Sequence, residues 1–379
     1  MTIRRFYILA VVLMSMTATG LTSCDEMHDP ELHIPGKVEM ELVIDQEIVL
    51  DNLWGADWTA KWLYQWDEER YGPIGYTEPE TYHIDYFQSQ THNHIGSRDM
   101  MGNRVRLNLS YGIYDMLSYN NDFEVVHIDE SSDWKSIRAF TNRNSYAQKP
   151  SSMETSESAY IAEMPDQLFS VLNKDIEIDD DLSNYEWDPE EGVWLLKIEN
   201  LLKPRVFIYL VQVRLLNNNG RVVNSGALTI DGLAADVELK TGLTSQESVA
   251  HQFATFFSHY TYEDGTSVPL IAGKMTTFGV CGEEIWTRYL ESKGKSQTKA
   301  GLTRNENSPN NTCHIQLIFR NGASLFVPVD ITDQIWANPY GGVIDIVLDI
   351  DDYEEPPASG GGIDIGVGGW DEDIHDITV

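Results

Sequence analysis

Short runs in which apolar and polar residues alternate recur along the whole chain, and they limit what it can fold into. In KVEMELVID, Val38, Met40 and Leu42 alternate with glutamates. A period of two residues is typical of a β-strand with one buried face. Comparable runs, closed by Gly, Pro, Asn and Asp, are TYHIDYFQ, RVRLNLSYGIYDMLSY, DFEVVHI, VWLLKIEN, PRVFIYLVQVRLL, KMTTFGVCG and CHIQLIF. The pattern predicts an all-β protein.

The first 23 residues have the features of a bacterial lipoprotein signal peptide. Two arginines precede an apolar run of about eleven residues, and Leu21-Thr22-Ser23 leads into Cys24. The run is shorter than the roughly twenty residues that a membrane-spanning helix needs. We therefore expect cleavage before Cys24, lipidation of Cys24 and attachment to a membrane through the acyl chains.

The rest of the chain is long enough for two domains of about 150 residues. An acidic stretch at 178–192 marks the boundary, and the turn spacing on both sides favours β-sandwiches. Residues 160–174 have a mixed pattern that fits a short helix or turn. The predicted parts are a signal peptide at 1–23, a lipidated N-terminus and linker at 24–36, an N-terminal β-sandwich at 37–185, a C-terminal β-sandwich at 186–352, and a Gly/Pro linker with C-terminal strands at 353–379.

Charge and missing motifs restrict the function. Sixty acidic against 26 basic residues give a net charge of −34, which repels nucleic acid and anionic lipid heads. The motifs G-x-S-x-G, H-E-x-x-H, G-x-x-x-x-G-K-[ST] and G-x-G-x-x-G do not occur. We therefore expect a protein that is not an enzyme, with no catalytic residue, cofactor or metal.

Four tryptophans recur every four residues, at Trp54, Trp58, Trp62 and Trp66. The spacing fits one face of a helix or of a strand. An intervening glycine and aspartate argue against a continuous helix, so we expect a strand from about Thr59 onward. Such aromatics could form a sugar-binding platform, but filling a sandwich core is the favoured interpretation.

Two cysteines remain besides Cys24, namely Cys281 and Cys313. An exported compartment is oxidising and favours a disulfide between them. Their apolar, strand-like surroundings fit two buried thiols equally well. The sequence leaves both possibilities open.

Weaker patterns suggest metal ligands. His92 and His94 form an H-x-H pair, and His83 and Asp85 precede them on a predicted strand, an arrangement that could bind zinc. Acidic residues alternate at 175–181 and could bind calcium, but EF-hand spacing is absent. An exposed polar strand or loop and a solvated acidic linker are the favoured interpretations.

Several motifs resemble a known family. They are YGIYDMLSYNNDFE at 111–124, GALTIDGLAADVELKTG at 226–242, GKMTTFGV at 273–280, VPVDITDQI at 327–335 and the closing GGGIDIGVGGW. Together they resemble lipoproteins of the gut Bacteroidales related to FimB-like fimbrial anchor and tip subunits, and the related lipoproteins of uncharacterised function. The resemblance implies two tandem transthyretin-like, Greek-key β-sandwiches, an outer-membrane lipid anchor and a place in a fimbrium or adhesive assembly.

The resulting hypothesis is a lipid-anchored cell-envelope protein that works by binding or assembly. Strand addition between fimbrial subunits is the predicted mechanism, with Ile363, Ile365 and Val367 as a candidate donor strand or as the last strand of their own domain. Asp25 and Glu26 behind the lipid site resemble a surface-export signal, which Met27 and His28 cut short. The alternative is a solitary surface lipoprotein that binds a glycan or host ligand.

Overall fold

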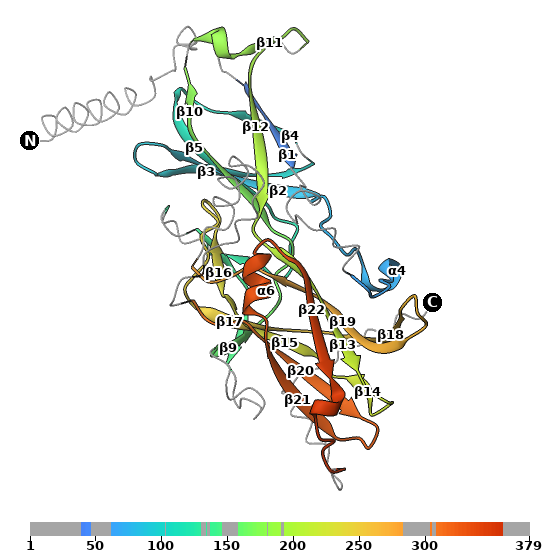
Figure 1. Cartoon of the computed structure of the whole chain (residues 1–379). Coiled ribbons are helices and arrows are strands. Elements are labelled where there is room, and N and C mark those ends of the chain that lie inside the picture. Colours follow the sequence, from blue (N-terminus) through green and yellow to red (C-terminus); the bar gives the residue numbers. More distant parts are fainter. Residues whose placement is uncertain are drawn as a thin grey trace, which may run out of the picture. The chain divides into compact units, whose positions relative to one another are not determined.

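The computed structural model describes residues 39–46, 62–102, 104–129, 134, 137–145, 158–179, 181–190, 193–282, 304 and 308–358 (Figure 1). Cys24, Trp54, Trp58 and the predicted donor strand lie outside the described residues. Within these residues the structure is almost entirely β, so the predicted all-β class is confirmed.

The N-terminal sheet has the strand order β3-β2-β5-β10-β12-β1-β4, and β11 pairs with β12 beside this path. Its central pairs are antiparallel, with Tyr82 opposite Asn120 and Phe169 opposite Pro204. The strands are β1 (Glu39–Gln46), β2 (Thr81–Gln88), β3 (His94–Met101), β4 (Arg104–Asn108), β5 (Gly112–Asn120), β10 (Phe169–Ile178), β11 (Glu186–Asp188) and β12 (Val193–Pro204).

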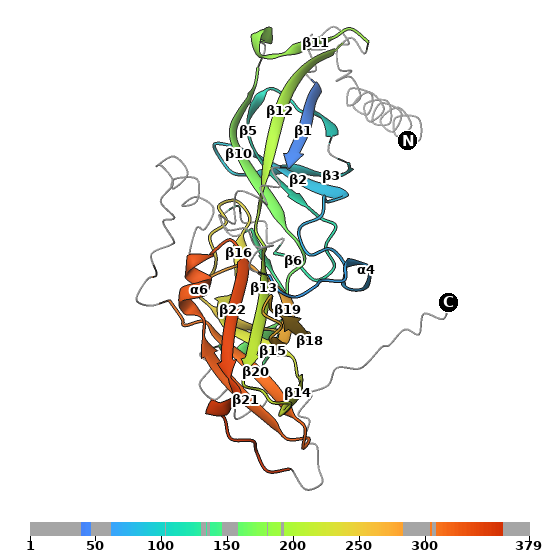
Figure 2. The same cartoon turned by 45° about the vertical axis from the view of Figure 1, so that its right-hand side comes forward.

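A four-stranded sheet and a seven-stranded sheet form a sandwich in the C-terminal half. Figure 2 shows the four strands β18, β19, β13 and β22 side by side in this order. The four-stranded sheet consists of β13 (Phe207–Leu216), β18 (Phe256–Thr261), β19 (Ser267–Thr277) and β22 (Gly342–Asp349). The seven-stranded sheet consists of β8 (Arg143–Ser145), β9 (Tyr160–Ala162), β14 (Val222–Ser225), β15 (Leu228–Ala234), β17 (Ser248–Phe253), β20 (Thr312–Phe319) and β21 (Ser324–Asp330).

A three-stranded sheet and a few helical turns complete the described fold. The small sheet has the order β16-β7-β6. Its strands are β6 (His127–Ile128), β7 (Arg138–Phe140) and β16 (Asp236–Glu238), and the helical turns are α4 (Glu68–Tyr71), η4 (Leu182–Asn184), α6 (Thr332–Ala337) and η5 (Ile350–Asp352).

The core of the C-terminal sandwich follows directly from the alternation in the sequence. Tyr209, Val211 and Val213 of β13 point inward and meet residues such as Ile230 of β15 and Ile315 of β20 from the facing sheet. Each of these side chains is fully buried. Burying a large apolar side chain contributes about 1.5–3 kcal/mol, so this contiguous cluster is the main stabilising element of the sandwich.

A second apolar cluster joins β2 and β5 to the three-stranded sheet. Leu117 and Phe87 pack there with Val237, Ala139 and Phe278. Arg205, on the loop between β12 and β13, lies beside this cluster and donates from Nε to the hydroxyl of Ser170 at 2.6 Å. Burial lowers the pKa of Arg205 to about 10, and the charge of Glu238 opposes this shift.

The described residues form two compact units. One consists of Arg106–Gly112, Ile178–Lys197 and the first described residues as far as Leu42, and the other contains the remaining described residues. Within the smaller unit, β11 and the start of β12 form a hairpin in which Trp187 and Trp194 pack at 5.4 Å between ring centroids. The predicted division at residues 185 and 186 stays a prediction.

Two local predictions were wrong. Residues 62–67 are irregular and lead into α4, where a strand was expected from Thr59 onward. Their aromatic side chains are half-buried against the outer face of the four-stranded sheet, so this segment needs no strand partner. Residues 160–174, expected as a helix or turn, contain β9 and the first part of β10, because these residues pair with β17 and β12.

Candidate functional site

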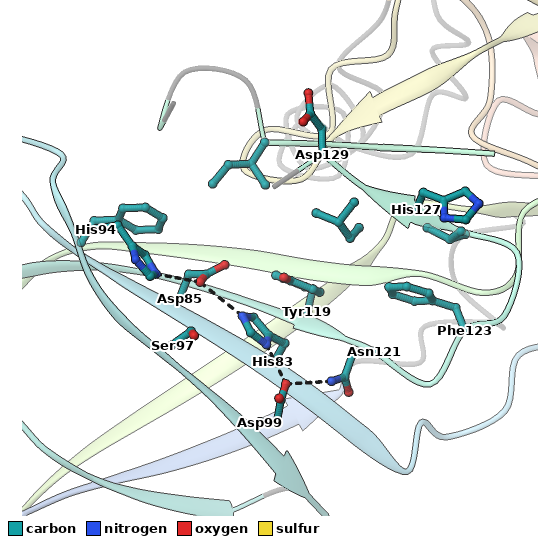
Figure 3. A pocket seen from close by; sticks show the side chains of 14 residues that line it. His83, Asp85, His94, Ser97, Asp99, Tyr119, Asn121, Phe123, His127 and Asp129 are labelled. Carbon is teal, nitrogen blue, oxygen red and sulfur yellow. Dashed lines mark hydrogen bonds and ion pairs between the residues drawn. The ribbon is translucent and has the colours of Figure 1, made fainter. Parts of the chain in front are cut away.

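A groove of about 640 Å³ lies over the β2–β3 hairpin, with β6 and the loop before it on the opposite side (Figure 3). The register places Asp85 of β2 opposite Ser97 of β3, and His83 opposite Asp99. Because side chains alternate along a strand, these four residues share one face of the hairpin. The groove therefore has one polar wall made by two adjacent strands.

The polar wall is a chain of hydrogen bonds, drawn as dashed lines in Figure 3. His94 Nε2 and His83 Nε2 lie 3.1 and 3.2 Å from Oδ1 of Asp85. His83 Nδ1 lies 2.7 Å from Oδ1 of Asp99, and Asn121 donates to the same oxygen at 2.9 Å. Two carboxylates and two imidazoles thus hold one another in fixed positions.

His83 is the central residue of this chain because each of its ring nitrogens faces a carboxylate. A neutral imidazole has only one N–H, whereas both nitrogens of an imidazolium donate. Burial lowers the pKa of His83, but the hydrogen bonds and charges of Asp85 and Asp99 outweigh burial and raise it above the usual value. The geometry therefore favours a positive charge on His83 between two negative ones.

The opposite side of the groove is largely apolar. Phe123, Val126, Ile128 and Ile137 line it, together with the polar residues His127 and Asp129. The ring of Tyr119 packs against His83 at 5.0 Å between centroids and continues this surface beneath the polar wall. No lysine or arginine occurs among the described residues that line the groove. A surface with carboxylates on one side and apolar groups on the other suits an uncharged amphipathic ligand.

The structure separates the two histidines of the H-x-H pair. His94 joins the polar wall, but His92 lies in the turn with φ of 57° and stacks on Trp134 at 4.7 Å. In the part of the chain that the structure describes, no group of three or more His, Cys, Asp or Glu is arranged to hold a metal ion. Asp99 and Asn121 belong to the wall but were missed, although the alternation of Ser97 and Asp99 could have revealed Asp99.

A second groove, of about 730 Å³, lies where β18 and β14 approach each other. Phe257 and His259 of β18, Val222 and Val223 of β14, and Arg320 line it. Both strands are at the margins of their sheets. The groove is therefore bordered by backbone edges as well as by side chains.

The outer edge of β18 is unpaired among the described residues. Tyr262 N donates to the carbonyl of Thr266 at 2.8 Å, which makes this a hydrogen-bonded pair of the β18–β19 hairpin. Because such pairs alternate in an antiparallel ladder, the amides of Phe257, His259 and Thr261 face away from β19. This edge can accept a further strand.

Side-chain amides close two other edges of the sandwich. Oε1 of Gln334 accepts from the N–H of Asp345 in β22 at 2.9 Å, and its Nε2 donates to the carbonyl of Asp345 at 3.1 Å. Asn218 makes the same pair of bonds to Val222 of β14, at 2.7 and 2.9 Å. Each amide occupies the position that a peptide group of an added strand would take.

The remaining sheet edges of the sandwich are also poorly suited to accept an added strand. The carbonyl of Ala323 accepts from the N–H of Phe319 at 2.9 Å, so this pair is hydrogen-bonded. Pairs alternate along β20 and β21, so the backbone of Pro328 faces the outer edge. Proline has no N–H to donate to an added strand there. At the other end of the same sheet, β8 has only three residues. Among the described strands of the sandwich, β18 is thus the longest edge without a closing feature.

The described members of the tryptophan series fill gaps between elements. Trp62 packs on Ile208 and Leu210. Trp66 donates from Nε1 to the carbonyl of Gly72 at 2.9 Å and packs edge-on against Phe256 at 5.7 Å. Both side chains are half-buried, which limits their use as an exposed platform. The sugar-platform role of the series stays a prediction for Trp54 and Trp58.

Cys281 and Cys313 are free buried thiols, so the structure contains no disulfide between them. They belong to different apolar clusters, Cys313 to the sandwich core and Cys281 to the cluster beneath β5. Burial raises the pKa of Cys281 to about 12, with a smaller effect of Asp236. The buried-thiol interpretation describes both residues.

Comparison with known proteins gives a family match. Residues 71–253 match the family model described as Domain of unknown function (DUF5119). The DUF5119 region contains two of the motifs that carried the sequence resemblance, at 111–124 and 226–242. It extends from the end of α4 to the end of β17. The predicted resemblance to a family of uncharacterised function is thereby confirmed for these residues. No curated protein matches the chain.

Three solved structures are similar at low identity. A proposed adhesin from Bacteroides ovatus is 14% identical, covers 86% of this chain and 95% of its own, and has a TM-score of 0.47. The fimbrial anchor protein Mfa2 from Porphyromonas gingivalis is 9% identical, covers 82% of this chain and 90% of its own, and has a TM-score of 0.40. The tip fimbrial protein Mfa3 from the same organism, with a C-terminal truncation, is 11% identical, covers 77% of this chain and 81% of its own, and has a TM-score of 0.29. Because the TM-scores lie below 0.5, the function proposed below rests on this chain's own residues.

Proposed function

We propose that the protein is a cell-envelope subunit that joins a fimbrial or adhesive assembly by β-strand addition at β18. The observation that carries the proposal is the open edge of this strand beside the groove to β14. Added strands gain affinity from main-chain hydrogen bonds and specificity from alternate side chains. A strand lying along β18 would accept hydrogen bonds from the amides of Phe257, His259 and Thr261. Its alternate apolar side chains would lie in the groove.

The protected neighbouring edges support this choice. Open sheet edges invite unwanted pairing, and proteins block them with prolines, short strands or covering elements. Gln334, Asn218 and Pro328 provide such blocks on β22, β14 and β21. An edge left open beside three blocked ones fits an acceptor site selected for one partner.

The C-terminal end of the described chain supports a role for the tail. Arg221, next to β14, donates to the carbonyl of Ile350 at 2.8 Å, and Asn321 donates to the carbonyl of Pro356 at 2.8 Å. These bonds fix the start of the tail beside the strand that borders the groove. We propose that Ile363, Ile365 and Val367 fill an acceptor edge, either in their own domain or in a neighbouring subunit.

The N-terminal sequence completes the proposal. Lipidation at Cys24 would tether the protein to the outer membrane, with Asp25 and Glu26 favouring display at the cell surface. Among the described residues, no helix is long and apolar enough to span a bilayer. We propose a binding role without catalysis, in agreement with the absence of known catalytic motifs in the sequence.

Substituting proline at His259 is expected to abolish assembly. It removes an outward N–H from β18 but leaves the bonds to β19 in place, because His259 and Pro269 form a non-hydrogen-bonded pair. In an immunoblot of mildly denatured cells, the heat-dissociable ladder should disappear while the melting temperature of the purified protein stays within about 3 °C.

Val347→Pro is the matched control on the closed edge. The backbone N–H and carbonyl of Asp345 point toward Gln334 and away from β13. Because backbone direction alternates along a strand, the N–H of Val347, two residues further on, also points away from β13. This variant should retain the ladder. A ladder that survives in His259→Pro, or is lost equally in both variants, would exclude β18 as the acceptor edge.

Substituting alanine at Gln334 is expected to open the edge of β22. The N–H and carbonyl of Asp345 would lose both partners and become available to a second copy of the chain. Light scattering of the purified protein should then show a concentration-dependent dimer or larger species. Asp333→Ala, an exposed neighbour on α6, should remain like the parent, and an unchanged Gln334→Ala variant would show that the amide does not block pairing.

A further inference from the structure

The groove over the β2–β3 hairpin is independent of the proposed acceptor edge, and its chemistry is that of a small-ligand site. At about 640 Å³ it lies within the 300–1,000 Å³ usual for ligand pockets. It combines a polar wall of fixed geometry with an apolar wall that contains Phe123, Val126 and Ile128. We propose that this groove binds a neutral carbohydrate through its hydroxyl groups and one apolar ring face.

The polar wall offers acceptors to hydroxyl donors. Oδ1 of Asp85 and of Asp99 is occupied by histidine or asparagine, whereas Oδ2 of each accepts no bond among the described residues. An ionised carboxylate has no donor of its own, so each of these Oδ2 atoms can accept a hydrogen bond from a ligand hydroxyl.

The charges of the groove select an uncharged ligand. An acidic sugar would meet Asp85, Asp99 and Asp129, with no lysine or arginine among the described lining residues to pair with it. An ammonium group would compete with His83 and His94, which already bond to the two aspartates of the polar wall. Neutral hydroxyls can donate to the open carboxylate oxygens without displacing these bonds.

The apolar wall suits the C–H face of a sugar ring. A pyranose presents C–H groups on one face and hydroxyls around its rim. Phe123 is half-buried and packs on the cluster beneath β5, so its exposed part is held in a fixed orientation. In Figure 3 Phe123 and the chain of His94, Asp85, His83 and Asp99 line the same groove, Phe123 from the loop before β6 and the chain from β2 and β3.

Binding can be tested by titration calorimetry of the full-length mature protein with three neutral trisaccharides of gluco, manno and galacto configuration. Trigalacturonic acid and a lysine tripeptide test the anionic and cationic alternatives. We expect at least one neutral trisaccharide to bind with Kd below about 1 mM, and the charged probes to give no heat. Asp99→Ala and Phe123→Ala should each weaken binding at least tenfold, with melting temperature recorded for every variant.

Asp352→Ala is the control, because it removes an exposed aspartate outside the groove. It should bind like the parent protein. The proposal is overturned if none of the three neutral trisaccharides binds, if a charged probe binds in their place, or if Asp99→Ala and Phe123→Ala keep the parental affinity. None of these outcomes affects strand addition at β18, so the two proposals fail separately.

Discussion

Substituting alanine at Gly232 is expected to lower the free energy of unfolding by about 3–5 kcal/mol. Gly232 has φ of 76° and lies in an irregularity of the β15–β17 pairing. A Cβ atom there would be 2.1 Å from the carbonyl oxygen of Asn310 and 2.9 Å from its carbonyl carbon. Because the obstacle is backbone, relief of the clash requires displacing the chain before β20.

Gly265 is the matched control for this change. It also has positive φ, 85°, but a Cβ atom would meet nothing within 4 Å. Gly265→Ala should therefore cost only the backbone strain of about 1 kcal/mol. Urea unfolding of both variants measures the difference. Equal losses in the two variants would show that the close approach of Asn310 does not constrain the fold.

Lowering the pH from 7 to 4.5 is expected to reduce stability through His251. This residue is fully buried in β17, and its Nδ1 lies 3.0 Å from the carbonyl of Ala162. Burial lowers its pKa to about 4, and the bond to Ala162 opposes this shift. The folded protein therefore takes up the proton less readily than the unfolded chain, whose histidine titrates near 6.5.

The stabilising contribution of neutral His251 is complete above about pH 6.5 and is lost as the pH falls toward the folded value. From pH 7 to 4.5 the loss should be about 2 kcal/mol. His251→Asn keeps a donor for the carbonyl of Ala162 but cannot titrate. Between pH 7 and 4.5 the free energy of unfolding of this variant should therefore fall by about 2 kcal/mol less than that of the parent protein. If urea unfolding gives the same pH dependence for both proteins, His251 is protonated without penalty in the folded state.

Alternation in the sequence predicted many of the strands, for example β13 and β20, which each place every second residue in one core. It failed for residues 62–67, where half-buried aromatic side chains pack on the outer face of the four-stranded sheet. Sequence patterns record which residues are apolar, but they do not tell which surface buries them. The aromatic cluster of Tyr64, Trp66, Tyr71 and Phe256 shows this limit.

The candidate sites depend on contacts between distant residues and were less predictable. His83, Asp85 and His94 were visible in the sequence as possible ligands, but the hairpin register was needed to add Asp99. Gln334 was recognised only as part of the 327–335 motif, and its role became clear from the position of α6 beside β22. The glycines of the 226–242 motif were recognised only as part of a resemblance. The close approach of Asn310 explains one of them, Gly232.

Strand addition at the β18 edge can be tested with an immunoblot of the native protein from its own cells. Samples are compared after mild and after full denaturation, with His259→Pro and Val347→Pro expressed in the same cells. We expect a ladder of heavy species that dissociates on heating, persists in Val347→Pro and is absent in His259→Pro. A single monomer band under both treatments in the parent strain would rule out strand addition at β18.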